Sequence, residues 1–175
     1  MGVDRDYNAA VEFIDRHVAE GRGNKAAVVD ASRSISYAQL HDAVTRVGPA
    51  LARFGVEPEN RIAIIVHDSI EFLVLFWGAI RAGVVPVLLN TLLTEDQYNY
   101  LFVDSRAKLV FASIPLLPVV LKAAAGVSTL RQVVAVGDGP QSVPRFEALL
   151  AAERQGAPPA PTCGDEVAYW LYSSG

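Results

Sequence analysis

The stretch RIAIIVHDSIEFLVLFWGAIRAGVVPVLL (residues 61–89) contains two short apolar runs separated by a longer segment. Residues 61–66 and 84–89 are almost entirely apolar, which predicts strands that are buried on both faces. The segment between them has the length of a helix, with Asp68 predicted to open it and Gly83 to stop it. A strand, a helix and a second strand in this order predict two parallel strands joined by a right-handed crossover.

The same alternation continues on both sides of this stretch. Two of the further helices begin with a predicted capping box, Ser36 with Gln39 and Thr94 with Gln97. We predict further strands over residues 25–30, 33–37, 108–113, 132–137 and 166–172, and further helices over residues 7–19, 36–54, 94–104, 114–125 and 145–153. The expected fold class is therefore α/β, a mostly parallel sheet covered by helices on both faces.

Composition narrows the class of function. The 175 residues are 51% hydrophobic and 19% charged, which is typical of one globular domain with a sizeable core. The formal net charge of −4 and the scattered Lys and Arg residues argue against a nucleic-acid partner. The longest apolar run, residues 70–80, is about half the length of a membrane span. The N-terminus lacks the apolar core of a signal peptide, so we expect a cytoplasmic protein without a membrane partner.

Few residues suggest catalysis or metal binding. Cys163 is the single cysteine, so it cannot form an internal disulfide, and no Cys/His cluster has metal-ligand spacing. His67 and Asp68 together would suit acid–base chemistry, but a strand end and a helix cap explain both residues. The glycine-rich residues 137–140 lack the spacing of a dinucleotide-binding motif, which favours an ordinary turn.

The carboxyl ends of the predicted parallel strands are where a ligand is expected to bind. Among the loops there, Ser173, Ser174 and Gly175 are the best phosphate candidates. Small residues let backbone amides approach an anionic oxygen, and Ser hydroxyl groups add donors. The same three residues also suit a common turn, so the residues alone leave both interpretations open.

Three segments in this order resemble motifs of the adenylate-forming (AMP-dependent) acyl-CoA synthetases and ligases. ISYAQL (35–40) is similar to an early strand-to-helix motif, and GAIRAGVVPVLLN (78–90) is similar to the second motif. YSSG (172–175) resembles the opening of the family's phosphate-binding loop. Within the family, residues 8–30 and 88–111 look most like the benzoate-CoA ligases.

The resemblance implies a reaction in two steps. A carboxylate attacks the α-phosphorus of ATP held with Mg²⁺, which gives an acyl-adenylate and pyrophosphate, and the thiol of coenzyme A then displaces AMP. The substrates would be benzoate or a close aromatic acid, ATP and coenzyme A. Ser173, Ser174 and Gly175 would contact the β- and γ-phosphates. The family's catalytic lysine, adenine-binding residues and acyl pocket lie beyond residue 175, so no catalytic residue and no metal ligand is expected in this chain.

The resemblance also predicts the domain organisation. Residues 1–153 would form the N-terminal α/β part of the AMP-binding domain, residues 154–165 a linker, and residues 166–175 a strand and the start of the phosphate-binding loop. The chain would then be the first part of a longer enzyme, incomplete in fold and inactive alone. The sequence leaves open whether the enzyme forms a homo-oligomer. The alternatives are an adenylation domain that loads a carrier protein, a fatty-acyl-CoA ligase, or a stand-alone non-catalytic α/β binding module.

Overall fold

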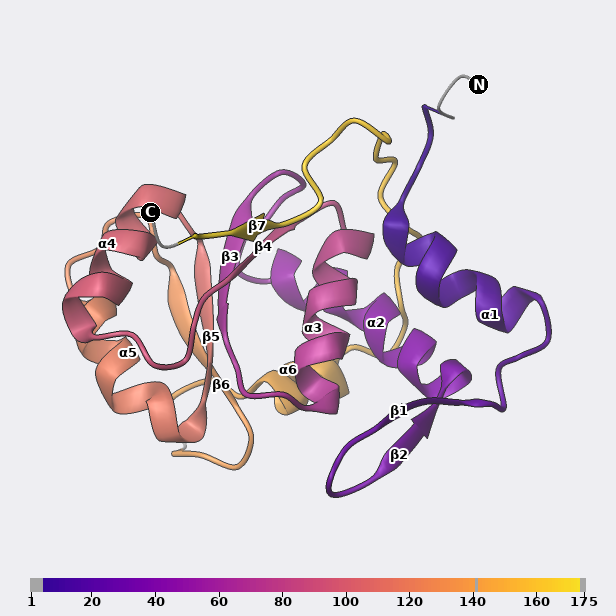
Figure 1. Ribbon diagram of the computed structural model, residues 1–175, viewed down its shortest axis with the longest axis horizontal. Helices are drawn as coiled ribbons and strands as arrows, with labels where there is room; N and C mark the ends of the chain where they lie inside the picture. Colours follow the sequence, from indigo (N-terminus) through magenta and orange to yellow (C-terminus); the bar gives the residue numbers. More distant parts are fainter. Residues whose placement is uncertain (1–4, 141, 174–175) are drawn as a thin grey trace.

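The computed structural model describes residues 5–140 and 142–173 and contains one large parallel sheet. The large sheet has five strands in the order β6-β5-β3-β4-β7, and every pairing in it is parallel (Figure 1). Its strands are β3 (Arg61–Ile65), β4 (Val85–Leu88), β5 (Leu109–Ser113), β6 (Gln132–Val136) and β7 (Trp170–Leu171). A separate antiparallel pair consists of β1 (Ala26–Val29) and β2 (Ser34–Ser36). The predicted α/β fold class is therefore confirmed.

Helices precede β1 and follow each strand from β2 to β6. They are η1 (Val11–Asp15), α1 (Arg16–Ala19), α2 (Tyr37–Ala52), α3 (Ile70–Arg81), α4 (Glu95–Ser105), η2 (Ile114–Leu116), α5 (Leu117–Ala124) and α6 (Phe146–Ala152). Both predicted capping boxes are present, at the starts of α2 and α4. Within the described ranges, no helix combines the length and the apolar character needed to cross a membrane.

The two faces of the sheet support separate apolar clusters. On β3, Ile62 and Ile64 point into the cluster beneath α2, α3 and α6, whereas Ala63 and Ile65 point into the cluster beneath α4 and α5. All four residues are at most 1% exposed, and successive side chains of a strand alternate between faces. Figure 1 shows α3 on one side of the sheet and α4 and α5 on the other. Helices therefore cover the sheet on both faces, as predicted.

The start of α3 differs from the prediction. Its N-cap is Ser69, whose Oγ accepts a hydrogen bond from the amide of Phe72 at 3.2 Å, and Asp68 is not the cap. A cap oxygen must reach the amide three residues further along, and the extended backbone of Ser69 places its hydroxyl group there. The end of the helix agrees with the prediction, because Gly83 has a φ of +70° in the left-handed region.

The strand predicted over residues 166–172 is much shorter in the structure. Only Trp170 and Leu171 pair with β4, opposite Val87 and Leu88. β4 itself has four residues, and the chain before Trp170 runs away from it instead of extending the ladder. The predicted edge strand is therefore present only at residues 170–171, opposite the second half of β4.

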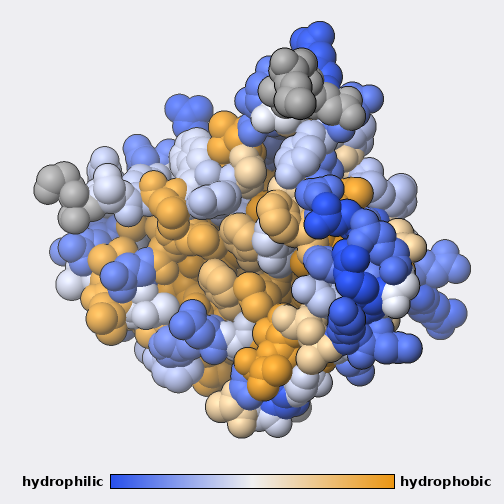
Figure 2. Space-filling view, turned by 45° about the vertical axis from the view of Figure 1, so that its right-hand side comes forward, coloured by the Kyte–Doolittle hydropathy of each residue, from blue (hydrophilic) through white to orange (hydrophobic). Residues whose placement is uncertain are grey.

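Apolar side chains remain on the surface around this edge strand. Val167, Tyr169 and Leu171 are 59%, 46% and 66% exposed, respectively. On the face shown in Figure 2, apolar side chains gather in the middle, and hydrophilic side chains dominate at the right of the view. The molecule thus has a well-covered sheet centre and a sparsely covered edge at β7.

The segment between α6 and β7 lies against the body of the domain. The amide of Ala157 donates to the carbonyl of Thr45 at 2.9 Å, and the amide of Ala160 donates to the carbonyl of Arg81 at 2.8 Å. The Arg81 side chain forms an ion pair with Asp15 at 3.0 Å and also donates to the carbonyl of Ala157 at 2.5 Å. Arg81 is 7% exposed, so this contact joins η1, α3 and the connecting segment in a largely buried position.

Candidate functional site

The ends of β3 and β5 at the carboxyl edge of the sheet are fixed to each other. The amide of His67 donates to the Oγ of Ser113 at 3.0 Å. His67 and Asp68 are both exposed, and neither side chain has a partner that would prepare it for proton transfer among the residues that the structure describes. The interpretation of His67 as a strand-end residue therefore agrees with its structure.

The N-terminus of α3 is occupied by groups of the protein. Besides the Ser69 cap, the carboxylate of Asp30 accepts from the amide of Ile70 at 3.4 Å. Hydrogen bonds to Asp30, above all from the hydroxyl group of Ser32, lower its pKa to about 2, so it is ionised at neutral pH. Glu71 in the first turn pairs with Arg33. This helix end is already neutralised and offers little to a phosphate group.

The loop after β6 is an ordinary turn. The amide of Gly137 donates to Oε1 of Glu147 at 2.7 Å, and Asp138 forms an ion pair with Arg145 at 2.7 Å. A Cβ atom at Gly139 would lie 2.2 Å from the side chain of Ile114, so the glycine allows close packing. Protein groups thus use the polar atoms of this loop, which supports the predicted turn.

The loop after β4 is held by Asn90, the last residue of the second motif. Its Oδ1 accepts from the amide of Leu92 at 2.8 Å, and its carbonyl accepts from the hydroxyl group of Tyr98 at 2.7 Å. Tyr98 is fully buried, and burial raises the pKa of its hydroxyl group. Asn90 therefore fixes the path of the chain into α4 and has a structural role.

A cavity of about 590 Å³ lies where β4 and β7 end. It is lined by residues 88–90 and 93 at and after the end of β4, by Asp96, Gln97, Tyr100 and Leu101 of α4, and by Tyr172 and Ser173 after β7. The lining is mostly apolar, and within the described residues its one charged side chain is Asp96. The position of the cavity agrees with the ligand-binding edge of an open parallel sheet.

The structure places one of the three predicted phosphate-binding residues at this cavity. Ser173 is exposed and lines it. Ser174 and Gly175 lie outside the described residues. The described lining contains no positively charged side chain that could neutralise a triphosphate.

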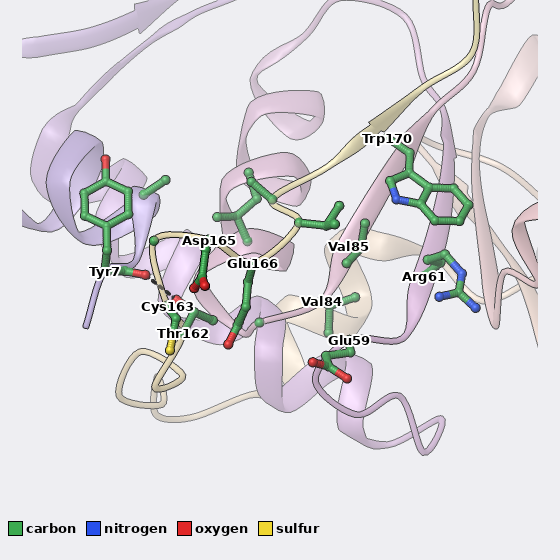
Figure 3. Close-up of a pocket in the computed structure, with 16 residues that line it drawn as sticks. Tyr7, Glu59, Arg61, Val84, Val85, Thr162, Cys163, Asp165, Glu166 and Trp170 are labelled. Atoms are coloured by element: carbon green, nitrogen blue, oxygen red, sulfur yellow. Dashed lines mark hydrogen bonds between the residues drawn. The ribbon is translucent and has the colours of Figure 1, made fainter. Parts of the chain in front are cut away.

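A second cavity, of about 410 Å³, lies where β3 and β4 begin, at the amino ends of the strands (Figure 3). Arg61, Val85 and Trp170 line one side of it, and residues 162–168 line the other. Burial raises the pKa of the Cys163 thiol, and nearby Glu166 adds to the effect. A thiol with a raised pKa is a poor nucleophile at neutral pH, so Cys163 shows no sign of activation.

The described residues provide no metal centre. Across residues 5–140 and 142–173, no group of three or more His, Cys, Asp or Glu side chains could hold a metal ion. Mg²⁺ that accompanies a nucleotide is commonly held by one or two carboxylates together with substrate phosphates. Of the residues that line the carboxyl-edge cavity, Asp96 is the carboxylate that could contribute in this way.

Sequence reasoning missed two contacts at the edge of the sheet. The guanidinium group of Arg61 lies 5.2 Å from the ring centre of Trp170. The hydroxyl group of Tyr172 donates to Oδ2 of Asp104 at 2.6 Å. Neither contact has a signal in the local sequence, because its partners are far apart along the chain.

Comparisons with known proteins agree with this fold. A family model described as AMP-binding enzyme matches residues 15–175. The 4-hydroxybenzoate–CoA/benzoate–CoA ligase of Rhodopseudomonas palustris is 61% identical to the chain, over 98% of the chain and 32% of the relative. The benzoate–CoA ligase of Thauera aromatica is 42% identical, over 97% of the chain and 32% of the relative.

Solved structures show the same relationship. A benzoate CoA ligase from Burkholderia xenovorans LB400 has a TM-score of 0.86 at 36% identity, covering 95% of this chain and 32% of that one. The anthranilate CoA ligase AuaEII in complex with anthranoyl-AMP has a TM-score of 0.93 at 26% identity, covering 99% of this chain and 33% of that one. The chain spans about a third of the length of the curated relatives it matches. Its sequence and its parallel α/β sheet place the chain in the family of AMP-binding enzymes.

Proposed function

We propose that this chain is the N-terminal part of an AMP-forming aromatic acid–CoA ligase that acts on benzoate, 4-hydroxybenzoate or a close analogue. The observation that carries the proposal is the 61% identity to the 4-hydroxybenzoate–CoA/benzoate–CoA ligase, which extends over 98% of the chain. Two further aromatic-acid ligases, at 42% and 34% identity, support the same class of substrate.

The proposed reaction has two steps. A carboxylate oxygen of the aromatic acid attacks the α-phosphorus of ATP, and the bond to the bridging oxygen breaks to release pyrophosphate. The thiol of coenzyme A, on losing its proton, then attacks the acyl carbon of the acyl-adenylate, and AMP leaves. The first step makes a good leaving group on an otherwise unreactive carboxylate. Its barrier falls mainly through positioning and charge stabilisation of the phosphates.

We assign the residues of this chain to the phosphate end of that reaction. Ser173, Ser174 and Gly175 would begin the loop that contacts the β- and γ-phosphates of ATP. Ser173 supports this assignment, because it lies beside a cavity at the carboxyl edge of the sheet. Mg²⁺ bound with ATP would neutralise phosphate charge, and Asp96 is a carboxylate in the described lining of the same cavity.

We keep the domain organisation as part of the proposal. Residues 1–153 would be the N-terminal α/β part of the AMP-binding domain, residues 154–165 the linker, and residues 166–175 the strand and loop start. The remaining parts of the site would come from the rest of the enzyme, which we place in the cytoplasm, where ATP and coenzyme A are available.

Other acids are weaker candidates. A long-chain-fatty-acid–CoA ligase of Mycobacterium tuberculosis is 30% identical over 81% of the chain. A fatty acid–[acyl-carrier-protein] ligase of Streptomyces coeruleorubidus is 29% identical over 85% of the chain. Both are more distant than the aromatic-acid ligases at 61%, 42% and 34% identity, which favours an aromatic acid and coenzyme A over a fatty acid or a carrier protein.

A pyrophosphate-release assay on the full-length protein tests this proposal. The substrates compared are benzoate, hydroxybenzoates and medium-chain fatty acids, each with and without coenzyme A. We expect the highest kcat/KM with benzoate or a hydroxybenzoate, and mass spectrometry should then detect the aromatic acyl-CoA. Higher kcat/KM with the fatty acids would contradict the proposed substrate class.

A further inference from the structure

The backbone ladder alone holds β7 weakly. Only two residue pairs join it to β4, and Leu171 is 66% exposed at the edge of the sheet. A ladder of this length leaves the direction of the following residues poorly fixed. Side chains must therefore set the position from which the chain continues into Ser173.

Two side-chain contacts from β7 and its next residue lead to the same part of the molecule, the last turn of α4. Tyr172 reaches this turn directly, because its hydroxyl group donates to Oδ2 of Asp104 at 2.6 Å. Trp170 reaches it through Arg61, whose guanidinium group lies over the indole ring and whose Nε donates to the carbonyl of Ser105. Asp104 and Ser105 are consecutive, so both contacts converge on one site.

The last turn of α4 is itself well fixed. Ser105 is fully buried, and its Oγ donates to the carbonyl of Leu101 at 2.6 Å. Arg106 has a φ of +52°, which ends the helix in the left-handed region, and Ala107 is fully buried immediately after it. A turn held in this way can serve as a rigid support for the residues that contact it.

The Tyr172–Asp104 hydrogen bond lies at the surface, where Tyr172 is 37% exposed. The two oxygens are 2.6 Å apart, which is a short hydrogen bond between a hydroxyl donor and a carboxyl acceptor. Burial and the bond to Asp104 raise the pKa of the Tyr172 hydroxyl group, so it stays protonated and donates at neutral pH. Ser173 is exposed, so its own side chain contributes little packing to fix its position.

We propose that Tyr172 and Asp104 are positioning residues for Ser173, the residue with which the proposed ATP-phosphate loop begins. The inference rests on the proposed function, because it assumes that the loop starting at Ser173 binds phosphates. Tyr172 is covalently joined to Ser173, so a displacement of its ring shifts the first donor of the loop. Small displacements of positioned groups are costly for catalysis.

The test measures ATP affinity by calorimetry, and KM and kcat by pyrophosphate release, in the full-length enzyme. Tyr172→Phe removes the hydroxyl group and leaves the ring. We expect about three- to fivefold weaker ATP binding and a similarly raised KM for ATP, as for loss of one partly exposed hydrogen bond. The KM for the aromatic acid should stay within about twofold, because the proposed role of the loop is to contact the β- and γ-phosphates of ATP.

Tyr169→Phe is the matched control. Tyr169 lies in the same segment, its ring packs against Phe76 with ring centres 5.6 Å apart, and its hydroxyl group has no hydrogen bond within residues 5–140 and 142–173. We expect wild-type ATP affinity in this variant. An equal loss of ATP affinity in both variants would overturn the inference, because it would mean that the segment responds to any change.

Variants of Asp104 separate positioning from general destabilisation. Asp104→Ala should weaken ATP binding as much as Tyr172→Phe, and the double variant should be no worse than either. Asp104→Asn keeps an acceptor oxygen and should restore most of the affinity. Wild-type ATP affinity in Tyr172→Phe, or multiplicative losses in the double variant, would overturn the inference. Failure of the aromatic-acid assay with the expected ATP affinities would instead overturn only the proposed substrate.

Discussion

β3 and β7 belong to the same parallel sheet but are held in place by different means. β3 is central and pairs with a strand on each side, and Ile62 to Ile65 are at most 1% exposed. β7 is at the edge and pairs through two residues, with Leu171 largely exposed. Burial of its own side chains fixes the central strand, whereas the edge strand depends on partners that lie far away in the sequence.

This difference separates stability from site geometry. Full burial of one large apolar side chain contributes roughly 1.5–3 kcal/mol, and β3 provides several such side chains. β7 contributes less to stability, but it delivers Tyr172 and Ser173 to the carboxyl edge. Substitutions in β3 should therefore lower the free energy of unfolding. Substitutions in β7 should mainly alter the positions of Tyr172 and Ser173 at the carboxyl edge of the sheet.

The largest effect is expected from Ile64→Ala in β3. Ile64 is 1% exposed and packs in the cluster beneath α2 and α3. Loss of its side chain leaves a cavity at the centre of the sheet and should lower the free energy of unfolding by about 2–5 kcal/mol. Urea denaturation followed by circular dichroism measures this change. A cost below about 1 kcal/mol would show that the sheet centre can collapse around the cavity.

An intermediate effect is expected from Asp15→Ala. This change leaves Arg81, which is 7% exposed, without its ion-pair partner. Removal of one member of a buried pair commonly costs 3–5 kcal/mol. The hydrogen bond from Arg81 to Ala157 remains, and Asp15 is 18% exposed, so we expect about 2 kcal/mol of destabilisation.

Glu12→Ala is the control for this change, on the same helical segment. Glu12 pairs with Arg16, and both side chains are more than 40% exposed. Exposed pairs of this kind contribute at most about 1 kcal/mol, so the urea midpoint should barely move. Equal destabilisation by the two variants would show that the N-terminal helix, and not the buried ion pair, determines the result.

The sequence predicted the sheet centre much better than its edge. β3 to β6 lie within about two residues of their predicted limits, because dense apolar runs can hardly be accommodated except as buried strands. The capping boxes of α2 and α4 were predictable because their residues are three apart and both hydrogen bonds are local. The cap of α3 was wrong by one residue, because the backbone angles of Ser69 decide which side chain reaches the Phe72 amide.

At the candidate site, the sequence predicted the position of Ser173 but not the side-chain contact that holds the residue before it. Ser173 was expected at the carboxyl edge of the sheet and lines a cavity there. Its contact with phosphate stays a prediction. The length of β7 and the Tyr172–Asp104 contact depend on tertiary structure, since Asp104 precedes Tyr172 by 68 residues. No periodicity in a single sequence reports a pair at that separation.

The smallest effect is expected from Leu171→Ala in β7. A comparison with Val87→Ala in the paired strand β4 tests whether a buried strand contributes more to stability than the edge strand beside it. Val87 in β4 is fully buried, whereas Leu171, on the neighbouring strand, is 66% exposed. Because only about a third of the Leu171 side chain leaves water, its loss should cost below about 1 kcal/mol, against about 2 kcal/mol for Val87→Ala. Parallel urea denaturation of the two variants of residues 1–175 measures both values. Similar losses in the free energy of unfolding would mean that Leu171 is covered by other protein atoms in solution. β7 would then contribute to stability as much as the centre of the sheet does.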